Sequence, residues 1–206
     1  MFPLDDRRQD VAKFLARAEI FKKILNVHGS IVVGGVHDGV GLMTWAKLSA
    51  IYEPVNHTRR VVGFDTFDGF PSVSRFDGNA EVGGMATDSY ETISSSIAAF
   101  NADRPVGHIA KVELVKGDAT VTMPEWVQKY PHTVISLLHL DFDIYEPTLV
   151  ALETFYPRMP KGAAIVFDEL NMYEWPGETV ALMETLGFPA LRLERFPFTS
   201  TLSYAI

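Results

Sequence analysis

His139-Leu140-Asp141-Phe142-Asp143-Ile144-Tyr145-Glu146 closes an apolar run, residues 134–138, that is too short to cross a membrane and suits a buried strand. Side chains two residues apart lie on one face of a strand, so His139, Asp141 and Asp143 share a face if the chain stays extended. Carboxylates are rarely buried without a partner. We therefore expect the strand to end here and to open into a site.

Acidic residues also follow three other predicted strands. The apolar run 163–167 ends in Asp168-Glu169, the strand 61–65 ends in Asp65, and residues 111–116 lead into Asp118. In open α/β sheets, ligands bind at the carboxyl ends of the parallel strands. Together with Asp141, these tips predict one shared site that needs a cation, a proton or a substrate hydroxyl.

A glycine-rich turn follows the first predicted strand, within residues 30–41, and precedes a helix over about 42–51. This order is typical of α/β domains that bring backbone N–H groups close to a nucleotide-like ligand. The dinucleotide fingerprint G-x-G-x-x-G is not matched, because Thr44 takes the third glycine position counted from Gly39. Asp65, at the tip of the next strand, could accept hydrogen bonds from both ribose hydroxyls. A purely structural turn is the alternative for both features.

Composition favours one soluble domain spanning residues 1–206, in the cytoplasm. The chain is 47% hydrophobic, has a formal net charge of -8 and contains no Cys. An acidic chain is a poor candidate for nucleic-acid binding, which depends on neutralising phosphates. The sequence shows no apolar segment long enough for a membrane span and no signal pattern at the N-terminus. The absence of Cys excludes disulfides, thiolate metal sites and a Cys nucleophile.

The remaining elements complete an α/β pattern. We expect an N-terminal helix within residues 1–29, capped by Asp10, whose apolar stripe packs on the sheet or on a copy of itself in a dimer. Residues 66–87 lack a regular pattern and are expected to form a lid or binding loop. Helices follow at about 90–100, 146–156 and 178–186, and 191–195 and 202–206 form an antiparallel pair. The stripe comprises Val11, Phe14, Leu15, Ala18, Phe21 and Leu25.

Several motifs, in this order, resemble the class I S-adenosylmethionine-dependent methyltransferases, and most closely the macrocin O-methyltransferase group, which methylates sugar hydroxyls of natural products. They are Gly35-Val36-His37-Asp38-Gly39, Phe64-Asp65-Thr66-Phe67-Asp68-Gly69-Phe70-Pro71, Asp141-Phe142-Asp143-Ile144-Tyr145 and Phe167-Asp168-Glu169. The resemblance covers about residues 30–186. It implies a Rossmann-like fold with a seven-stranded, mostly parallel sheet, a C-terminal antiparallel hairpin and helices on both faces.

The resemblance also implies roles for individual residues. The turn from Gly35 to Gly39, with His37, would contact the methionine part of S-adenosylmethionine, Asp65 and Thr66 the ribose, and Asp118 and Ala119 the adenine. Asp141, Asp168 and Glu169 would hold Mg²⁺ or another divalent cation, with Asp141 also beside the cofactor. Asp143 would be the general base, and His139 is a further catalytic candidate, although a satisfied core histidine is its more common role. Val33 stands where many relatives carry an acid, and Glu169 replaces a shorter Asp.

The chemistry agrees with these roles. A sugar hydroxyl is too weak an acid to attack a sulfonium methyl group readily, and a hard cation lowers its pKa while a carboxylate takes the proton. The predicted function is metal-assisted O-methylation of a small-molecule hydroxyl. Titration with S-adenosylmethionine tests this prediction, which requires that the cofactor binds. Two alternatives stay open: a dinucleotide-dependent oxidoreductase, and a non-catalytic binding protein on the same scaffold.

Overall fold

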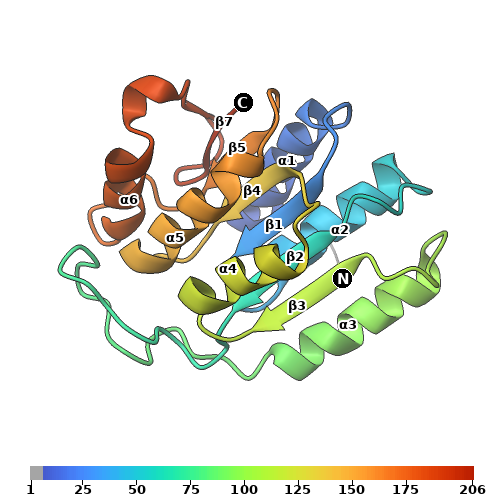
Figure 1. The fold of residues 1–206 in the computed structure, drawn as a ribbon, viewed down its shortest axis with the longest axis horizontal. Coiled ribbons are helices and arrows are strands. Elements are labelled where there is room, and N and C mark those ends of the chain that lie inside the picture. Colours follow the sequence, from blue (N-terminus) through green and yellow to red (C-terminus); the bar gives the residue numbers. More distant parts are fainter. Residues whose placement is uncertain (1–6) are drawn as a thin grey trace.

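The computed structural model describes residues 7–206, and its centre is a seven-stranded sheet in the order β3-β2-β1-β4-β5-β7-β6 (Figure 1). Strands β1 to β5 pair in parallel, whereas β7 is antiparallel to both β5 and β6. The predicted mostly parallel sheet with a C-terminal antiparallel pair is confirmed. The strands are β1 (Ser30–Gly34), β2 (Val61–Asp65), β3 (Val112–Lys116), β4 (Ile135–Leu140), β5 (Ala164–Phe167), β6 (Glu194–Arg195) and β7 (Ser203–Ala205).

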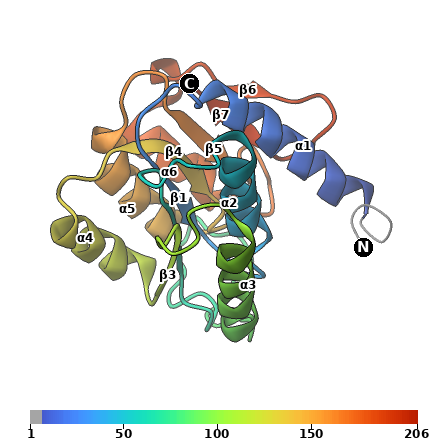
Figure 2. The same cartoon turned by 90° about the vertical axis from the view of Figure 1, so that its right-hand side faces the viewer.

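Within residues 7–206, six α-helices cover the two faces of this sheet, three on each (Figure 2). One face packs under α1, α2 and α3 around Trp45, and the other under α4, α5 and α6 around Phe155. Burying one such large side chain contributes about 1.5–3 kcal/mol. The helices are α1 (Arg8–Lys23), α2 (Val40–Tyr52), α3 (Tyr90–Asp103), α4 (Ala119–Lys129), α5 (Tyr145–Phe155) and α6 (Gly177–Thr185), with short 3₁₀ turns η1 (Tyr156–Arg158) and η2 (Phe188–Ala190).

The central strands have no exposed face. Every residue of β1, β4 and β5 is buried, and their Val, Ile and Leu side chains alternate between the two helical layers. A parallel strand covered by helices on both sides needs such a continuous apolar sequence. Sheet order reverses between β1 and β4, which places a topological switch point at their carboxyl ends.

The strand ends line up across this switch point. Gly34 is level with Phe64 of β2 and with Leu140 of β4, and Leu140 is level with Phe167 of β5. The next residue on each strand is therefore Gly35, Asp65, Asp141 or Asp168. Four of the predicted site residues thus leave the sheet at the same height.

Helix α1 differs from the prediction in its start and in its buried face. It begins at Arg8, after Arg7, whose side chain makes no capping hydrogen bond, and Asp10 lies inside the first turn, so the prediction of Asp10 as the cap is wrong. Most of the predicted stripe does pack on the core: Phe21 is fully buried, and Phe14, Ala18 and Leu25 pack against the same cluster. Leu15 of the stripe is instead 51% exposed, and Ala12, Ala16 and Ile20 are buried although they were not part of it. The small alanine side chains let the helix approach its neighbours closely. Tertiary contacts, rather than the number of apolar residues on each side, decide which side of the helix faces the core.

Helix α4 was not predicted. Its sequence carries a proline, Pro124, and several polar residues, which weaken the helical signal. The structure provides a cap instead: the Asp118 carboxylate accepts hydrogen bonds from the Thr120 backbone N–H at 2.9 Å and from the Thr120 hydroxyl at 2.7 Å. Such a cap stabilises a helix by about 1 kcal/mol.

Candidate active site

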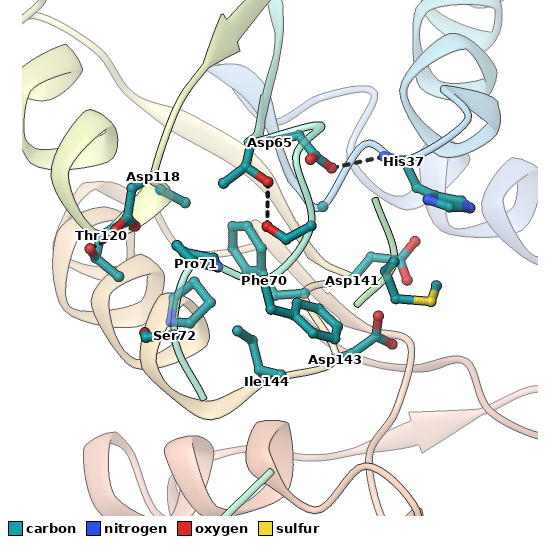
Figure 3. A pocket seen from close by; sticks show the side chains of 17 residues that line it. His37, Asp65, Phe70, Pro71, Ser72, Asp118, Thr120, Asp141, Asp143 and Ile144 are labelled. Atoms are coloured by element: carbon teal, nitrogen blue, oxygen red, sulfur yellow. Dashed lines mark hydrogen bonds between the residues drawn. The ribbon is translucent and has the colours of Figure 1, made fainter. Parts of the chain in front are cut away.

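A cleft opens at the carboxyl ends of β1, β2, β3 and β4, with about 610 Å³ of free space including its open mouth. Figure 3 shows Asp118 and Thr120 at one end, Asp141 and Asp143 at the other, and Phe70 between them. An elongated cleft of this kind suits a ligand with two chemically different ends. Of the predicted cofactor residues, Gly35, His37, Asp65, Thr66, Asp118, Ala119 and Asp141 line it.

Gly39 is the one predicted cofactor residue that does not line the cleft. It precedes α2 with a φ of 80°, and a side chain there would collide with Ile93 of α3, at 2.7 Å from its Cβ. Its role in the structure is to turn the chain into α2.

Asp65 organises the loops around the cleft. One of its carboxylate oxygens accepts hydrogen bonds from the backbone N–H groups of Val36, at 2.7 Å, and His37, at 2.9 Å, and the other accepts one from Phe67, at 2.7 Å. Each carboxylate oxygen has further lone pairs. Asp65 can therefore fix both loops and still accept a hydrogen bond from a ligand hydroxyl.

Gly35 is required by close packing. Its φ is 80°, and a Cβ there would lie 1.9 Å from the backbone oxygen of Asp141. Only glycine tolerates both this backbone conformation and this approach. The turn after β1 therefore sits directly against the chain that leaves β4, which holds the cleft beside the acidic residues.

Four carboxyl groups crowd at the tips of β4 and β5. Ligand atoms of Asp141, Asp143 and Glu169 lie within 4.8 Å of one another, and the same holds for His139, Asp141 and Asp168. Asp143 has a φ of 63°, so the chain turns there and returns its carboxylate to Asp141 although it has left the extended strand. The predicted metal residues Asp168 and Glu169 are each close to Asp141 but fall in different groups.

Helix α1 brings two cations to the buried Asp168. The Lys13 ammonium donates a hydrogen bond to Asp168 Oδ2, and a guanidinium nitrogen of Arg17 lies 3.8 Å from Asp168 Oδ1. Burial alone would raise the pKa of Asp168, but the neighbouring His139, Lys13 and Arg17 outweigh it and hold that pKa below its usual value. Asp168 is therefore ionised and its charge is compensated from within the chain.

In the other acids of the cluster, burial and neighbouring negative charges outweigh the nearby cations. Burial raises the pKa of Glu169 to about 12, with the charges of Glu178 and Asp141 adding to the shift. Burial and the charge of Asp168 raise the pKa of Asp141 well above its usual value and that of Asp143 to about 6. Without a further cation, this cluster keeps protons at neutral pH.

His139 is enclosed on the α2 side of the sheet and is completely buried. Its Nδ1 accepts a hydrogen bond from the Trp45 indole at 3.3 Å, and its Nε2 lies 3.8 Å from Asp168 Oδ1. Burial lowers the pKa of His139 to about 4, so the ring is neutral. The ring does not line the cleft, and its geometry fits a role in orienting Asp168.

Loop 66–87 contains no helix or strand (Figure 1). It contributes Phe70, Pro71 and Met85 to the wall of the cleft, and Figure 3 shows Phe70 and Pro71 there. Asp77 anchors its middle. This side chain is 1% exposed and accepts a hydrogen bond from the Tyr145 backbone N–H, at the start of α5, at 2.6 Å. The loop is thus tied to the segment that carries Asp143.

Sequence reasoning missed Lys13, Arg17, Asp77 and Glu178. Glu178, at the start of α6, is fully buried and accepts a hydrogen bond from the Glu169 backbone N–H at 3.0 Å. Its sequence position signals only a helix start. The residues that hold the acidic cluster in place come from distant segments, and only the fold brings them together.

Comparisons with known proteins identify the family. The family model described as Macrocin-O-methyltransferase (TylF) matches residues 11–182. The chain belongs to this family. It is therefore an O-methyltransferase with a Rossmann-like fold, and S-adenosylmethionine is its methyl donor.

Solved structures agree with this assignment. CalS11, described as a calicheamicin methyltransferase, is 35% identical with a TM-score of 0.95 over 98% of this chain and 81% of that one. A second CalS11 structure, described as an apo TDP-rhamnose 3'-O-methyltransferase, is 36% identical with a TM-score of 0.86 over 98% and 82% of the two chains. NovP, an O-methyltransferase, is 20% identical with a TM-score of 0.72 over 95% and 79%, and supports the fold alone. Curated protein sequences gave no match.

None of the helices within residues 7–206 is both long enough and apolar enough to traverse a lipid bilayer.

Proposed function

We propose that this methyltransferase acts, with the help of a divalent cation, on a hydroxyl of a sugar or of a sugar-bearing natural product. One observation carries the proposal: four carboxyl groups crowd together beside a cleft lined by the predicted cofactor residues. The names of the macrocin O-methyltransferase family and of CalS11 support a sugar acceptor. Sugar chemistry also suits the cluster, because a weakly acidic hydroxyl needs both charge stabilisation and a base.

The donor set fits a hard divalent cation such as Mg²⁺. Asp168 Oδ1 and Glu169 Oε2 are buried, and neither has a hydrogen-bond partner among residues 7–206. Unpartnered buried carboxylate oxygens are costly, and oxygen-rich sites of this type are those that Mg²⁺ prefers. We propose that Asp141, Asp168 and Glu169 hold the ion. Lys13 bonds to the other oxygen, Asp168 Oδ2, so its ammonium charge opposes binding of the ion without occupying Oδ1.

The side chains of the cleft then divide the work. S-adenosylmethionine, when bound, supplies the methyl group, and the cation polarises the acceptor hydroxyl. Asp143 takes the hydroxyl proton, because its carboxyl lies beside Asp141 and its pKa of about 6 leaves it ionised at neutral pH. Asp65, Thr66 and the turn at Gly35 position the donor, and Asp118 with Ala119 lines the far end of the cleft. Much of the catalysis is then alignment of oxygen, carbon and sulfur.

Loop 66–87 is proposed as the lid over this cleft. Its aromatic and proline side chains, Phe70 and Pro71, lie across the middle of the cleft in Figure 3. Closure by apolar groups excludes water, which strengthens the electrostatic contacts inside. Asp77 holds the closed position through its bond to α5.

The test is a methyl-transfer screen with isotopically labelled S-adenosylmethionine against sugars, nucleotide sugars, glycosides and phenols, read as a mass shift of the acceptor. We expect transfer to a sugar hydroxyl that stops with a chelator and returns with Mg²⁺. Asp143→Asn should lose transfer while S-adenosylhomocysteine still binds in calorimetry. Activity that survives complete chelation would contradict the role of the cation. Retained S-adenosylhomocysteine binding without transfer to any acceptor would favour a non-catalytic binding protein.

A further inference from the structure

Glu178 is a buried acid to which the proposed chemistry gives no role. It is the second residue of α6, and its side chain is completely buried. Burying a carboxyl group costs free energy, whereas burying an apolar side chain stabilises the fold. Burial also raises the pKa of Glu178 well above its usual value. The fold therefore keeps an unfavourable group at this position, and a specific contact is needed to explain it.

The contact is a hydrogen bond to the backbone of Glu169. Glu178 Oε1 accepts the Glu169 N–H at 3.0 Å, and the bond is buried. Within residues 7–206, the carboxyl group of Glu178 makes no other hydrogen bond and no ion pair, and its Oε2 has no partner. This single bond is therefore what the buried carboxyl group contributes to the structure.

Glu169 needs this acceptor because of its place at the end of β5. The N–H of the preceding Asp168 still bonds to the backbone oxygen of Leu140 in β4, at 3.1 Å. The N–H of Glu169 bonds to no strand, and a buried backbone N–H is nearly always paired in a folded protein. Glu178 thus provides from α6 the acceptor that the sheet no longer provides.

The next residue of α6 holds the same turn at a second point. Thr179 Oγ1 accepts the N–H of Asn171 at 2.9 Å. The N–H of Met172 closes the turn by bonding to the backbone oxygen of Glu169 at 3.1 Å. The first turn of α6 therefore fixes the chain that directly follows the acidic cluster.

This first turn is itself fixed by close packing. Gly177, the first residue of α6, lies so close to its surroundings that a Cβ there would be 2.4 Å from Asp77 Oδ1 and 2.5 Å from the backbone nitrogen of Tyr145. Helix α6 thus begins directly against the hydrogen bond that ties loop 66–87 to α5. Glu178 therefore offers its oxygen to Glu169 from a rigid support.

The backbone of Glu169 matters because its carboxyl group belongs to the acidic cluster. That carboxyl group lies within 4.8 Å of those of Asp141 and Asp143, and its Oε2 is buried without a partner among residues 7–206. A glutamate side chain loses more rotamer freedom on being fixed than a shorter one does. The direction of the Glu169 carboxyl group therefore depends strongly on how its backbone is held.

We propose that Glu178 is a positioning residue, which holds the Glu169 N–H and thereby aims the Glu169 carboxylate at the divalent cation. The inference rests on the proposed function, in which Glu169 is a ligand of that ion. Replacing a group that orients a metal ligand commonly weakens metal binding by about 10–100-fold. The role requires an acceptor oxygen at this place and does not require a negative charge.

The test compares two variants of the full-length protein by magnesium calorimetry. Glu178→Leu removes the acceptor, whereas Glu178→Gln keeps an amide oxygen that accepts the same N–H. We expect Mg²⁺ to bind at least about tenfold more weakly to Glu178→Leu and within about twofold of wild type to Glu178→Gln. S-adenosylhomocysteine should bind equally to all three proteins, because neither Glu169 nor Glu178 lines the cofactor cleft.

Glu184→Leu is the matched control. Glu184 lies on the same helix and carries the same charge, and it bonds on the surface to the Tyr145 hydroxyl, away from Glu169. Its replacement should leave the affinity for Mg²⁺ unchanged. If Glu178→Leu fails to fold, as shown by loss of S-adenosylhomocysteine binding, Glu178→Met serves as the variant without an acceptor.

Kinetics provide the second readout. The Mg²⁺ concentration that gives half-maximal methyl transfer should rise in Glu178→Leu by the same factor as the dissociation constant. Wild-type affinity for Mg²⁺ in Glu178→Leu would overturn the proposal. Equal weakening in Glu178→Gln would also overturn it, since the charge and not the acceptor would then matter. Both outcomes leave the cation role intact, whereas a wild-type protein that binds no Mg²⁺ would remove that role and this inference together.

Discussion

Replacing Lys13 by Met removes the cation that neutralises Asp168 while keeping most of the aliphatic volume. The side chain of Lys13 is 37% exposed and that of Asp168 is 2% exposed. Exposed ion pairs contribute about 0–1 kcal/mol, whereas removing one partner of a buried pair costs about 3–5 kcal/mol. This half-buried pair lies between those limits, so we expect a loss of about 2 kcal/mol in the free energy of unfolding without metal.

The same substitution should tighten metal binding, because an ammonium group and a divalent ion compete for Asp168. At a separation of about 5 Å and an effective dielectric constant of about 20, they would repel by about 7 kcal/mol. Solvent at the exposed side of Lys13 screens most of this, and we expect at least about a tenfold gain in Mg²⁺ affinity.

The assay combines urea unfolding with magnesium calorimetry. In EDTA, Lys13→Met should unfold at lower urea, and Mg²⁺ at about 100 times its dissociation constant should restore about 2.7 kcal/mol. Lys22→Met is the matched control, because Lys22 lies on the same helix and pairs only with the exposed Glu19. Unchanged stability in EDTA together with unchanged Mg²⁺ affinity would refute the reasoning, since Asp168 would then be neither compensated by Lys13 nor a metal ligand.

Three further predictions concern other parts of the molecule. Asp141→Asn should lower methyl transfer by about a hundredfold or more with little change in S-adenosylhomocysteine affinity, and equal losses of both in rate assays and calorimetry would contradict this. Gly35→Ala should lower the free energy of unfolding in urea by about 3 kcal/mol or more, because Gly35 has a positive φ and approaches the backbone oxygen of Asp141 closely. A variant as stable as wild type would show that the turn relaxes. Lys111 donates to the backbone oxygens of Asn56 and Arg59, and burial lowers its pKa from 10.5 to about 8. Between these pH values the unfolded chain binds more protons, so wild type should gain stability with rising pH relative to Lys111→Met; a difference independent of pH would refute the shift.

Much of the sheet could be predicted from the sequence because its signals are local. The central strands are mostly apolar, and an acid or a glycine stands at or just after the end of each, as at Asp65, Asp141 and Asp168. In a parallel sheet the carboxyl ends of neighbouring strands lie at the same edge. The positions of the apolar runs in the sequence are therefore enough to predict that these residues come together. The hairpin was predicted in the right place, although β6 has only two residues.

The surroundings of the acids could not be predicted because they depend on long-range contacts. Lys13 and Asp168 are 155 residues apart in the sequence, and nothing near Lys13 indicates that it faces a carboxylate. The apolar stripe of α1 placed most of its core-facing side, but apolar spacing does not reveal that Arg17 is buried as well. Helix α4 was missed because its stability comes from the Asp118 cap and from packing, not from its own propensity.

The Asp77 anchor has a consequence for the speed of the enzyme. If loop 66–87 is the lid, as proposed, then exchanging S-adenosylhomocysteine for fresh methyl donor requires the hydrogen bond from the Tyr145 backbone N–H to the buried Asp77 carboxylate to break. We then expect release of S-adenosylhomocysteine, rather than the chemical step, to limit each turnover. Weakening this hydrogen bond should shorten the residence time of S-adenosylhomocysteine and raise kcat. The same change should lower the affinity for S-adenosylmethionine.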